Sequence, residues 1–320
     1  MLNDAASVGE TLIKYMPSEY DFTHIKRSRR FWGKSFGLAY KALRMDADLY
    51  HVHYLLQDCF FAQKFGKHPL IGHAHGSDLR DLIHSKRYGW IVKSNLKNCD
   101  KVFVTQPTIL ETALQYNKTA EYLPIPFDPE LFYPKPFVPK KRKVVFMPST
   151  LNHRTKGPGE FLLCLEGVKA DFELVLFASG PDYLDVKSLV KRYGFRARFL
   201  PPVPHEVMNL LYWDADLVLG AFSYHKRPVR QLDTVCVEAM ACGRPVISYL
   251  AEGFYGDVPL QSYTVQNCFD KVEGAMNLFL SDEVAVNEQV ARQLGYVNRV
   301  HAAPIVASRL AEVYKNMGKC

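Results

Sequence analysis

The sequence lacks several features that would assign the chain to a specialised class of protein. No apolar run approaches the roughly 20 residues that a membrane-spanning helix needs. The first residues, MLNDAASVGE, have neither the basic head nor the apolar core of a signal peptide. The seven cysteines are odd in number and show no CxxC spacing, which argues against a disulfide framework. We see no internal repeat and no low-complexity tract. These absences predict a soluble cytoplasmic protein with reduced thiols.

The length and the order of apolar segments predict two α/β domains. A chain of 320 residues with 48% apolar and 23% charged residues is too long for one ordinary core. Short apolar runs alternate with helical stretches, a pattern typical of parallel sheets that are covered on both faces. These runs are 48–56, 69–76, 101–106, 143–149, 172–179, 215–222 and 244–250. Two such doubly wound domains would place a ligand cleft at the carboxyl ends of their strands.

A proline-rich segment marks the expected joint between the domains. Residues 122–143 hold six prolines and no helical periodicity. We therefore expect an amino-terminal domain at 1–125, a linker at 126–142 and a carboxy-terminal domain at 143–320. The amphipathic stretch 303–318 predicts a closing helix, which would pack back on the amino-terminal domain.

The stretch VCVEAMACGRPVIS (235–248) places a single carboxylate, Glu238, in a helix that is otherwise apolar. Near a helix start such a carboxylate would stabilise the partially positive end of the helix. Alternatively it would accept hydrogen bonds from sugar hydroxyls in a cleft. The residue pattern by itself leaves both interpretations open.

This stretch resembles the EAMA-x-G-x-PV signature of family 4 glycosyltransferases, which are retaining enzymes of the GT-B fold. In that family the matching glutamate contacts the ribose of a nucleotide-sugar donor, so the resemblance assigns Glu238 to donor binding. Further segments resemble the family in the same order along nearly the whole chain. They are HVHY (51–54), GHAHGSDLR (72–80), NCDKVFVTQ (98–106), LPIPFDPELFYP (123–134), MPSTLNHRTKGPGEFL (147–162) and VPHEVMNLLYWDADLVLGAF (203–222).

Lys156 also has a physical argument for donor binding. It stands directly before Gly157 and an apolar helical stretch, so a cation and a helix start would face the same ligand. That combination suits a diphosphate, although a lysine here would also be compatible with a solvated surface. Arg154 is a second, weaker candidate, because the usual position of the family's arginine is occupied by Pro148 and Ser149.

The histidines form two H-x-H pairs, His51 with His53 and His73 with His75. Alternation along a strand puts the members of a pair on one face, so a metal site is conceivable. We expect core or strand-end histidines instead, and no metal. His75 matches the cleft histidine of the family, and we predict a catalytic role for it and for Asp78 in the same loop.

Two D-x-D triplets, Asp46 with Asp48 and Asp214 with Asp216, would suit a Mn²⁺-dependent glycosyltransferase. Each triplet stands just before a predicted strand, where carboxylates mark a helix-to-strand turn. We therefore expect these residues to be structural.

A basic segment at 24–44 contains seven lysines or arginines and no acid. Arg30, Lys34, Lys41 and Arg44 fall on one face of a predicted helix, opposite the aromatic residues. This face would be either a solvated surface or a contact with a lipid-linked acceptor at the inner, anionic face of a membrane. Nucleic acid is not expected, because no aromatic residue is interleaved on the basic face.

The sequence departs from the family at two places. Arg230 occupies a position where the family often has a second glutamate. The chain also begins where the first strand of the family normally ends, so that strand would be short or missing, and Asn3 and Ser7 would lie in the first cleft loop. The alternative to an enzyme is thus an inactive homologue that binds nucleotide-sugars. A GT-B epimerase would need acid–base carboxylates that we cannot locate.

Taken as a whole, the sequence predicts a retaining glycosyltransferase that needs no metal or other cofactor. It would transfer a sugar from a UDP- or GDP-sugar to a saccharide or a lipid-linked acceptor, as in polysaccharide or glycolipid synthesis.

Overall fold

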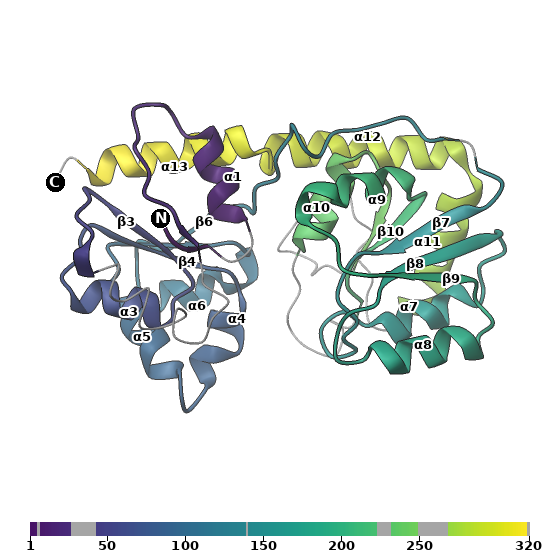
Figure 1. Ribbon diagram of the computed structural model, residues 1–320, viewed down its shortest axis with the longest axis horizontal. Helices are drawn as coiled ribbons and strands as arrows, with labels where there is room; N and C mark the ends of the chain where they lie inside the picture. The colour runs from purple at the N-terminus through teal and green to yellow at the C-terminus, as the bar shows by residue number, and fades with distance from the viewer. Residues whose placement is uncertain (5–6, 27–42, 139, 223–231, 249–267, 319–320) are drawn as a thin grey trace. The chain divides into compact units, whose positions relative to one another are not determined.

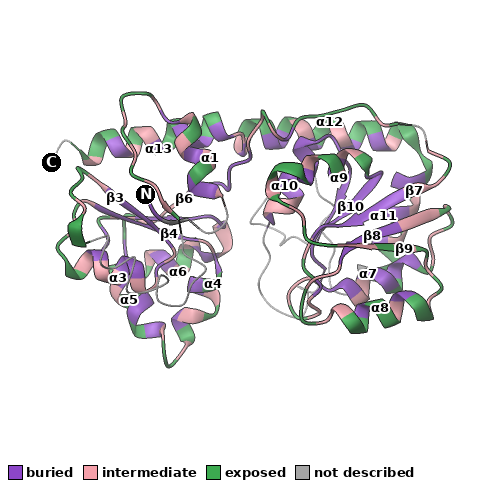
Figure 2. Cartoon of the chain, in the orientation of Figure 1, coloured by how far each residue is buried: buried purple, intermediate pink, exposed green. Residues whose placement is uncertain are grey.

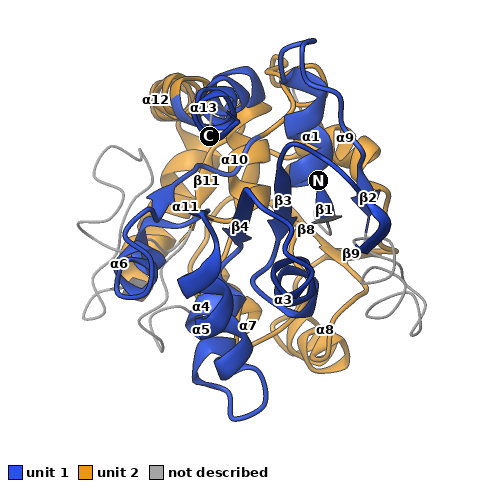
Figure 3. Ribbon diagram, turned by 90° about the vertical axis from the view of Figure 1, so that its left-hand side faces the viewer, with its two compact units in different colours: residues 1–126, 300–320 blue, residues 127–299 orange. Residues whose placement is uncertain are grey.

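The computed structural model describes residues 1–320 except 5–6, 27–42, 139, 223–231, 249–267 and 319–320 (Figure 1). The chain forms two compact units, one made of residues 1–126 and 300–320 and the other of residues 127–299 (Figure 3). Arg30, Lys34, Lys41 and Arg230 lie outside the described residues.

The first unit contains a parallel sheet of six strands in the order β2-β1-β3-β4-β5-β6. Its strands are β1 (Leu2–Asp4), β2 (Ile25–Lys26), β3 (Tyr50–His53), β4 (Leu70–Ala74), β5 (Lys101–Val104) and β6 (Glu121–Tyr122). Its helices are α1 (Val8–Tyr15), α3 (Gln57–Lys64), α4 (Ser77–Arg80), α5 (Gly89–Asn98), α6 (Leu110–Leu114) and α13 (Ala303–Met317), with short 3₁₀ turns η1 (Leu82–His84) and η2 (Pro107–Ile109).

Two separate cores cover the two faces of this sheet. Side chains alternate along each strand, so Val52 and Val102 point to one face and Ile71 and Phe103 to the other. The first face packs against α3 and α5, and the second against α1 and α13, which lie together on one side of the sheet in Figure 1. The strands in the middle of the sheet are buried along their length (Figure 2). The closing helix α13 thus belongs to the first unit.

The first strand was expected to be short or missing, and the structure shows the first of these. Strand β1 is short but present, and it pairs in parallel with β2 and β3, with Leu2 opposite Ile25 and Val52. Asn3 therefore lies within a strand and not in the loop after it. Ser7 stands just before α1, with a φ of 58°.

The second unit contains a parallel sheet of five strands in the order β11-β10-β7-β8-β9. Its strands are β7 (Lys143–Met147), β8 (Phe172–Phe177), β9 (Ala197–Leu200), β10 (Leu217–Leu219) and β11 (Val246–Ile247). Its helices are α7 (Pro158–Leu165), α8 (Tyr183–Arg192), α9 (Met208–Asp214), α10 (Thr234–Ala241), α11 (Cys268–Ser281) and α12 (Glu283–Val300), with one 3₁₀ turn, η3 (His205–Val207).

The strand order of this sheet reverses at β7. The chain runs from β7 outward through β8 to β9, then returns to place β10 on the other side of β7. Ligands of open α/β sheets bind at the carboxyl ends of the strands where the order reverses in this way. The expected site of this unit is therefore the edge formed by the ends of β7 and β10.

The proline-rich segment belongs largely to the second unit rather than to a free linker. Phe127 and Phe132 within it are buried, and the Trp213 indole on α9 donates a hydrogen bond of 2.8 Å to the Tyr133 carbonyl. Arg244 is buried beside this segment, and its guanidinium donates hydrogen bonds to four backbone carbonyls. These contacts fix the segment on the face of the sheet that α9 covers.

Among the described residues, no helix has both the length and the apolar character required to cross a membrane.

Candidate donor-binding site

The loop after β7 brings a cation to the expected edge of the second sheet. Lys156 Nζ lies 2.5 Å from the Asp233 carboxylate, and the two side chains are 22% and 6% exposed. The Lys156 carbonyl accepts a hydrogen bond of 3.0 Å from the amide of Phe222, which follows β10. The loop therefore lies beside the end of β10, at the point where the strand order reverses.

Gly157 turns this loop into α7. Its φ of 58° and ψ of 46° lie in the left-handed region, which glycine adopts without strain. Pro158 then occupies the first helical position, where the missing N–H costs no hydrogen bond. A helix N-terminus next to the ammonium of Lys156 is a site that favours an anion. Arg154 lies on the same loop and is exposed, so its contact with a donor remains a prediction.

Glu238 is not at the start of its helix. It is the fifth residue of α10 and is 3% exposed, so it does not cap the helix. Its Oε1 atom lies 2.6 Å from His205 Nε2, and its Oε2 atom accepts a hydrogen bond of 2.9 Å from the Tyr212 hydroxyl. The helix instead begins after Asp233, the partner of Lys156. The carboxylate is thus held on both sides by side chains of η3 and α9.

The environment of Glu238 changes the acid–base properties of its partners. The hydrogen bond with the Glu238 carboxylate raises the pKa of His205, against the opposing effect of partial burial. Burial, followed by the nearby Glu238 charge, raises the pKa of Tyr212 well above its usual value. The His205 ring also packs 5.3 Å from the ring of Phe132, between centroids. The raised pKa thus favours the imidazolium form of His205 beside the Glu238 carboxylate.

His205, Tyr212 and Asp233 are site residues that the sequence analysis missed. Asp233 carried a detectable signal, because an aspartate directly before an apolar helical run is typical of a helix start. His205 and Tyr212 carried none, since they lie 33 and 26 residues before Glu238 and meet it only in the fold.

In the first unit, His75 and Asp78 occupy the loop after β4. The Asp78 carboxylate is fully buried and accepts hydrogen bonds from four backbone amides, among them those of His75 and Gly76. Asp78 thus fixes the loop, including the left-handed Gly76 with its φ of 116°. His75 is half-buried, and its Nε2 atom lies 2.8 Å from His53 Nδ1. The structure places Asp78 as the residue that positions His75.

The basic segment can be followed only at its end. Arg44 is exposed, and the other three residues of its predicted face lie outside the described part of the chain. A membrane or acceptor surface here therefore remains a prediction.

Residues 141–258 match the family described as glycosyl transferases group 1. No curated protein matches the chain in sequence. The match covers β7 to β11, and it includes Lys156, Asp233, His205 and Glu238.

Several solved structures have the same fold. The Anabaena protein HepE in complex with UDP and glucose is 16% identical, with a TM-score of 0.69 over 92% of this chain and 86% of that one. An E. coli structure described as trehalose-6-phosphate bound with UDP-2-fluoro glucose is 14% identical, with a TM-score of 0.67 over 98% and 83%. The lipopolysaccharide outer core galactosyltransferase WaaB is 16% identical, with a TM-score of 0.61 over 88% and 79%.

The two parallel-sheet units have the architecture of GT-B glycosyltransferases, which confirms the fold predicted from the sequence. We conclude that the chain is a glycosyltransferase whose second unit carries the domain of glycosyl transferases group 1.

Proposed function

We propose that the chain transfers a sugar from a nucleotide-diphosphate donor with retention of configuration, and that its second unit binds the donor. UDP is the favoured nucleotide, because two of the structures with this fold are described with UDP or a UDP-sugar. The acceptor would be a saccharide or a lipid-linked sugar on the cytoplasmic side of a membrane. The observation that carries the proposal is the position of Lys156, beside the start of α7 at the reversal of strand order.

Lys156 and the start of α7 would bind the diphosphate and stabilise it as a leaving group. Negative charge grows on the diphosphate when the bond to the sugar breaks, and donors already fixed in place stabilise that charge without rearrangement. Asp233 holds the ammonium at 2.5 Å, and an ammonium group has three N–H donors, so a phosphate oxygen would share it with Asp233. A metal ion is not required for this charge compensation.

Glu238 would bind the ribose. A carboxylate has about four acceptor positions, and His205 and Tyr212 use one on each oxygen. The remaining positions would accept hydrogen bonds from ribose hydroxyls. His205 keeps the carboxylate in place.

His75 would act in the first unit, held by Asp78, and would hydrogen-bond the transferred sugar. None of the described side chains is an evident nucleophile in the donor site. The proposed mechanism is therefore attack by the acceptor hydroxyl on the face that the diphosphate leaves, with the diphosphate accepting the proton.

A panel of UDP- and GDP-sugars tests the proposal. Purified protein should be stabilised against melting by one class of donor and should release the nucleoside diphosphate when an acceptor is present. NMR of the product should show the anomeric configuration of the donor. Lys191→Ala, an exposed position on α8, is the matched control for Lys156→Ala. If a donor stabilises the protein but no tested acceptor leads to release of the nucleoside diphosphate, the chain is a nucleotide-sugar-binding protein instead.

A further inference from the structure

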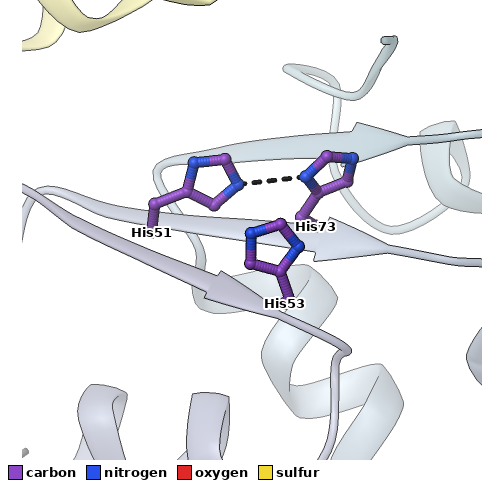
Figure 4. A group of neighbouring side chains, drawn as sticks. All are labelled: His51, His53 and His73. Carbon is purple, nitrogen blue, oxygen red and sulfur yellow. Dashed lines mark hydrogen bonds between the residues drawn. The ribbon is translucent and has the colours of Figure 1, made fainter. Parts of the chain in front are cut away.

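Four histidines lie on, or directly after, two neighbouring strands of the first unit. His51 and His53 are two residues apart on β3, His73 lies on β4, and His75 follows in the loop after β4. His53 is the register partner of His73, so the imidazoles gather on one face of the sheet. Figure 4 shows the rings of His51, His53 and His73 side by side across the two strands. All three side chains are at most 2% exposed.

The ring nitrogens of these three residues are close enough to share one ion. One nitrogen from each ring lies within 4.8 Å of the other two, and His51 Nε2 is 3.1 Å from His73 Nδ1. Histidine nitrogens bind Zn²⁺ at about 2.0–2.1 Å, so two tetrahedral ligands are about 3.3 Å apart. The His51–His73 pair already has this spacing, and the His53 nitrogen would have to move closer to both when an ion binds.

Two of the three rings are held by hydrogen bonds through their other nitrogen. His51 Nδ1 lies 2.6 Å from the Tyr314 hydroxyl of α13, and His53 Nδ1 lies 2.8 Å from His75 Nε2. Metal-binding histidines are oriented in this way, by a partner for the nitrogen that does not bind the metal. The arrangement places His51 Nε2 toward His73, at 3.1 Å from its Nδ1 atom.

Histidine binds a metal through a nitrogen lone pair of a neutral imidazole. His73 presents Nδ1 toward His51, and within the described part of the chain its buried Nε2 atom has no hydrogen-bond partner. A buried polar atom without a partner needs an explanation, such as an ion or a water beside the ring.

A cavity offers cations a route to the cluster. A hollow of about 490 Å³ reaches His51 and Tyr314, and four of its lining residues are acidic: Glu19, Asp21, Asp46 and Asp48. Carboxylates around an opening raise the local concentration of divalent cations. This cavity also accounts for the first D-x-D triplet, which the donor site does not use.

We propose that His51, His53 and His73 form a three-histidine site for a divalent transition-metal ion of the zinc class. Nitrogen ligands without carboxylates favour Zn²⁺, Co²⁺, Ni²⁺ and Cu²⁺ over Mg²⁺, Ca²⁺ and Mn²⁺. Three protein ligands leave one position of a tetrahedral ion for water or an anion. The ion would link β3 and β4 beneath α13, so its role would be to hold the first unit together. The proposal is independent of the donor site in the second unit.

Metal binding to the whole chain tests this site. Protein stripped with a chelator should take up one Co²⁺ per chain and develop the strong visible absorption of a four-coordinate ion. Zn²⁺ should displace the Co²⁺ and raise the melting temperature relative to the stripped protein. Mg²⁺ should do neither.

Three variants separate the site from adventitious binding at other histidines. His73→Gln removes a ligand and should abolish the Co²⁺ absorption. His84→Gln, at an exposed position on η1, should leave it unchanged. Tyr314→Phe removes only the partner of His51 Nδ1 and should weaken Co²⁺ binding about 10- to 100-fold.

A loss of Co²⁺ binding by His73→Gln is evidence for the site only if the metal-free variant is folded, which cooperative melting would show. If this variant does not melt cooperatively, His53→Gln replaces it. Absence of a stoichiometric Co²⁺ spectrum in the unchanged protein would overturn the proposal. The proposal would also be overturned if the His73→Gln and His53→Gln variants showed the same Co²⁺ absorption as the unchanged protein.

Discussion

The two units shift the pKa values of their clustered or paired histidines in opposite directions. In the second unit, the hydrogen bond with the Glu238 carboxylate raises the pKa of His205, which favours the imidazolium. In the first unit, burial lowers the pKa of His51, His53 and His73, which favours neutral rings. The difference follows from the neighbours, because His205 is paired with an acid whereas the other three contact one another.

This contrast matches the ligands that we propose for each unit. A diphosphate donor needs positive charge, which Lys156 would supply, and the raised pKa of His205 favours a charged ring in the same unit. A metal cation needs neutral nitrogen ligands, which the buried cluster supplies. The same residue type is thus suited to an anion in one unit and to a cation in the other.

A fall in pH should have the largest effect, because it should lower the stability of the fold through the buried histidines of the first unit. The folded-state pKa of each buried histidine of the cluster is lowered, so the unfolded chain takes up protons first as the pH falls below about 6.5. The stability that these groups contribute is complete above that pH and is lost below it, by up to about 1.4 kcal/mol per histidine and pH unit. Thermal melts from pH 8 to pH 5 measure the loss.

In the same melts, the contribution of His205 to stability should change with pH in the opposite direction. Its folded-state pKa is raised, so its contribution is complete below about pH 6.5 and is lost as the pH rises through the folded value. Solvent reduces the effect, because the side chain is 38% exposed. A His205→Gln protein should therefore keep the loss of stability in acid. If that loss disappears in the variant, the cluster is not its source.

Among the substitutions, Lys156→Ala should have the largest effect on donor binding and turnover. Loss of a charge-assisted hydrogen bond to phosphate should weaken UDP binding by about 1.5–3 kcal/mol. Turnover should fall further, since the charge on the leaving group is greater in the transition state. Calorimetry with UDP measures the affinity, with Lys191→Ala as the control. A donor affinity equal to that of the unchanged protein would remove Lys156 from the site.

Glu238→Gln should have a smaller effect on UDP binding, and it should test whether Glu238 is what raises the pKa of His205. The amide keeps the shape of the side chain but removes its charge, so the pKa of His205 should fall toward its usual value. UDP affinity should fall by about 1 kcal/mol, the value of an ordinary hydrogen bond, while the melting temperature changes little. NMR titration of His205 and calorimetry measure both quantities. Early melting with intact UDP affinity would give Glu238 a structural role only.

Added Mg²⁺ or Mn²⁺ should have no effect on the rate of sugar transfer. Lys156 and the start of α7 meet the charge of the diphosphate, so neither ion should change the rate of transfer. A transfer assay on dialysed protein, with and without each ion, checks this. A rate that depends on Mn²⁺ would place a metal in the donor site.

The architecture could be predicted from the sequence because apolar runs and helical stretches alternate over long distances. The ordered matches, from HVHY to EAMACGRPVIS, then predicted the GT-B fold. Local detail was harder to predict. The residues between the prolines of 122–143 lack periodicity, yet Phe132 among them packs into the second unit. An aromatic residue among prolines was the available signal.

The site was predictable only in part, since its partners come from distant elements. Lys156 and Gly157 could be recognised together because they are adjacent in the chain. The pairing of Lys156 with Asp233 spans 77 residues, and no pattern in the sequence connects them. Whether the first strand was short or missing could not be decided from the sequence, because three residues are too few to show alternation.

The account predicts that anion and metal bind to different units, and one NMR experiment tests this most directly. Histidine ring resonances would be followed while UDP, and in a second sample Zn²⁺, is added to the stripped protein. UDP should shift His205 and leave His51 and His73 unchanged, whereas Zn²⁺ should shift His51 and His73 and leave His205 unchanged. UDP-induced shifts of the buried cluster with none at His205 would contradict the account.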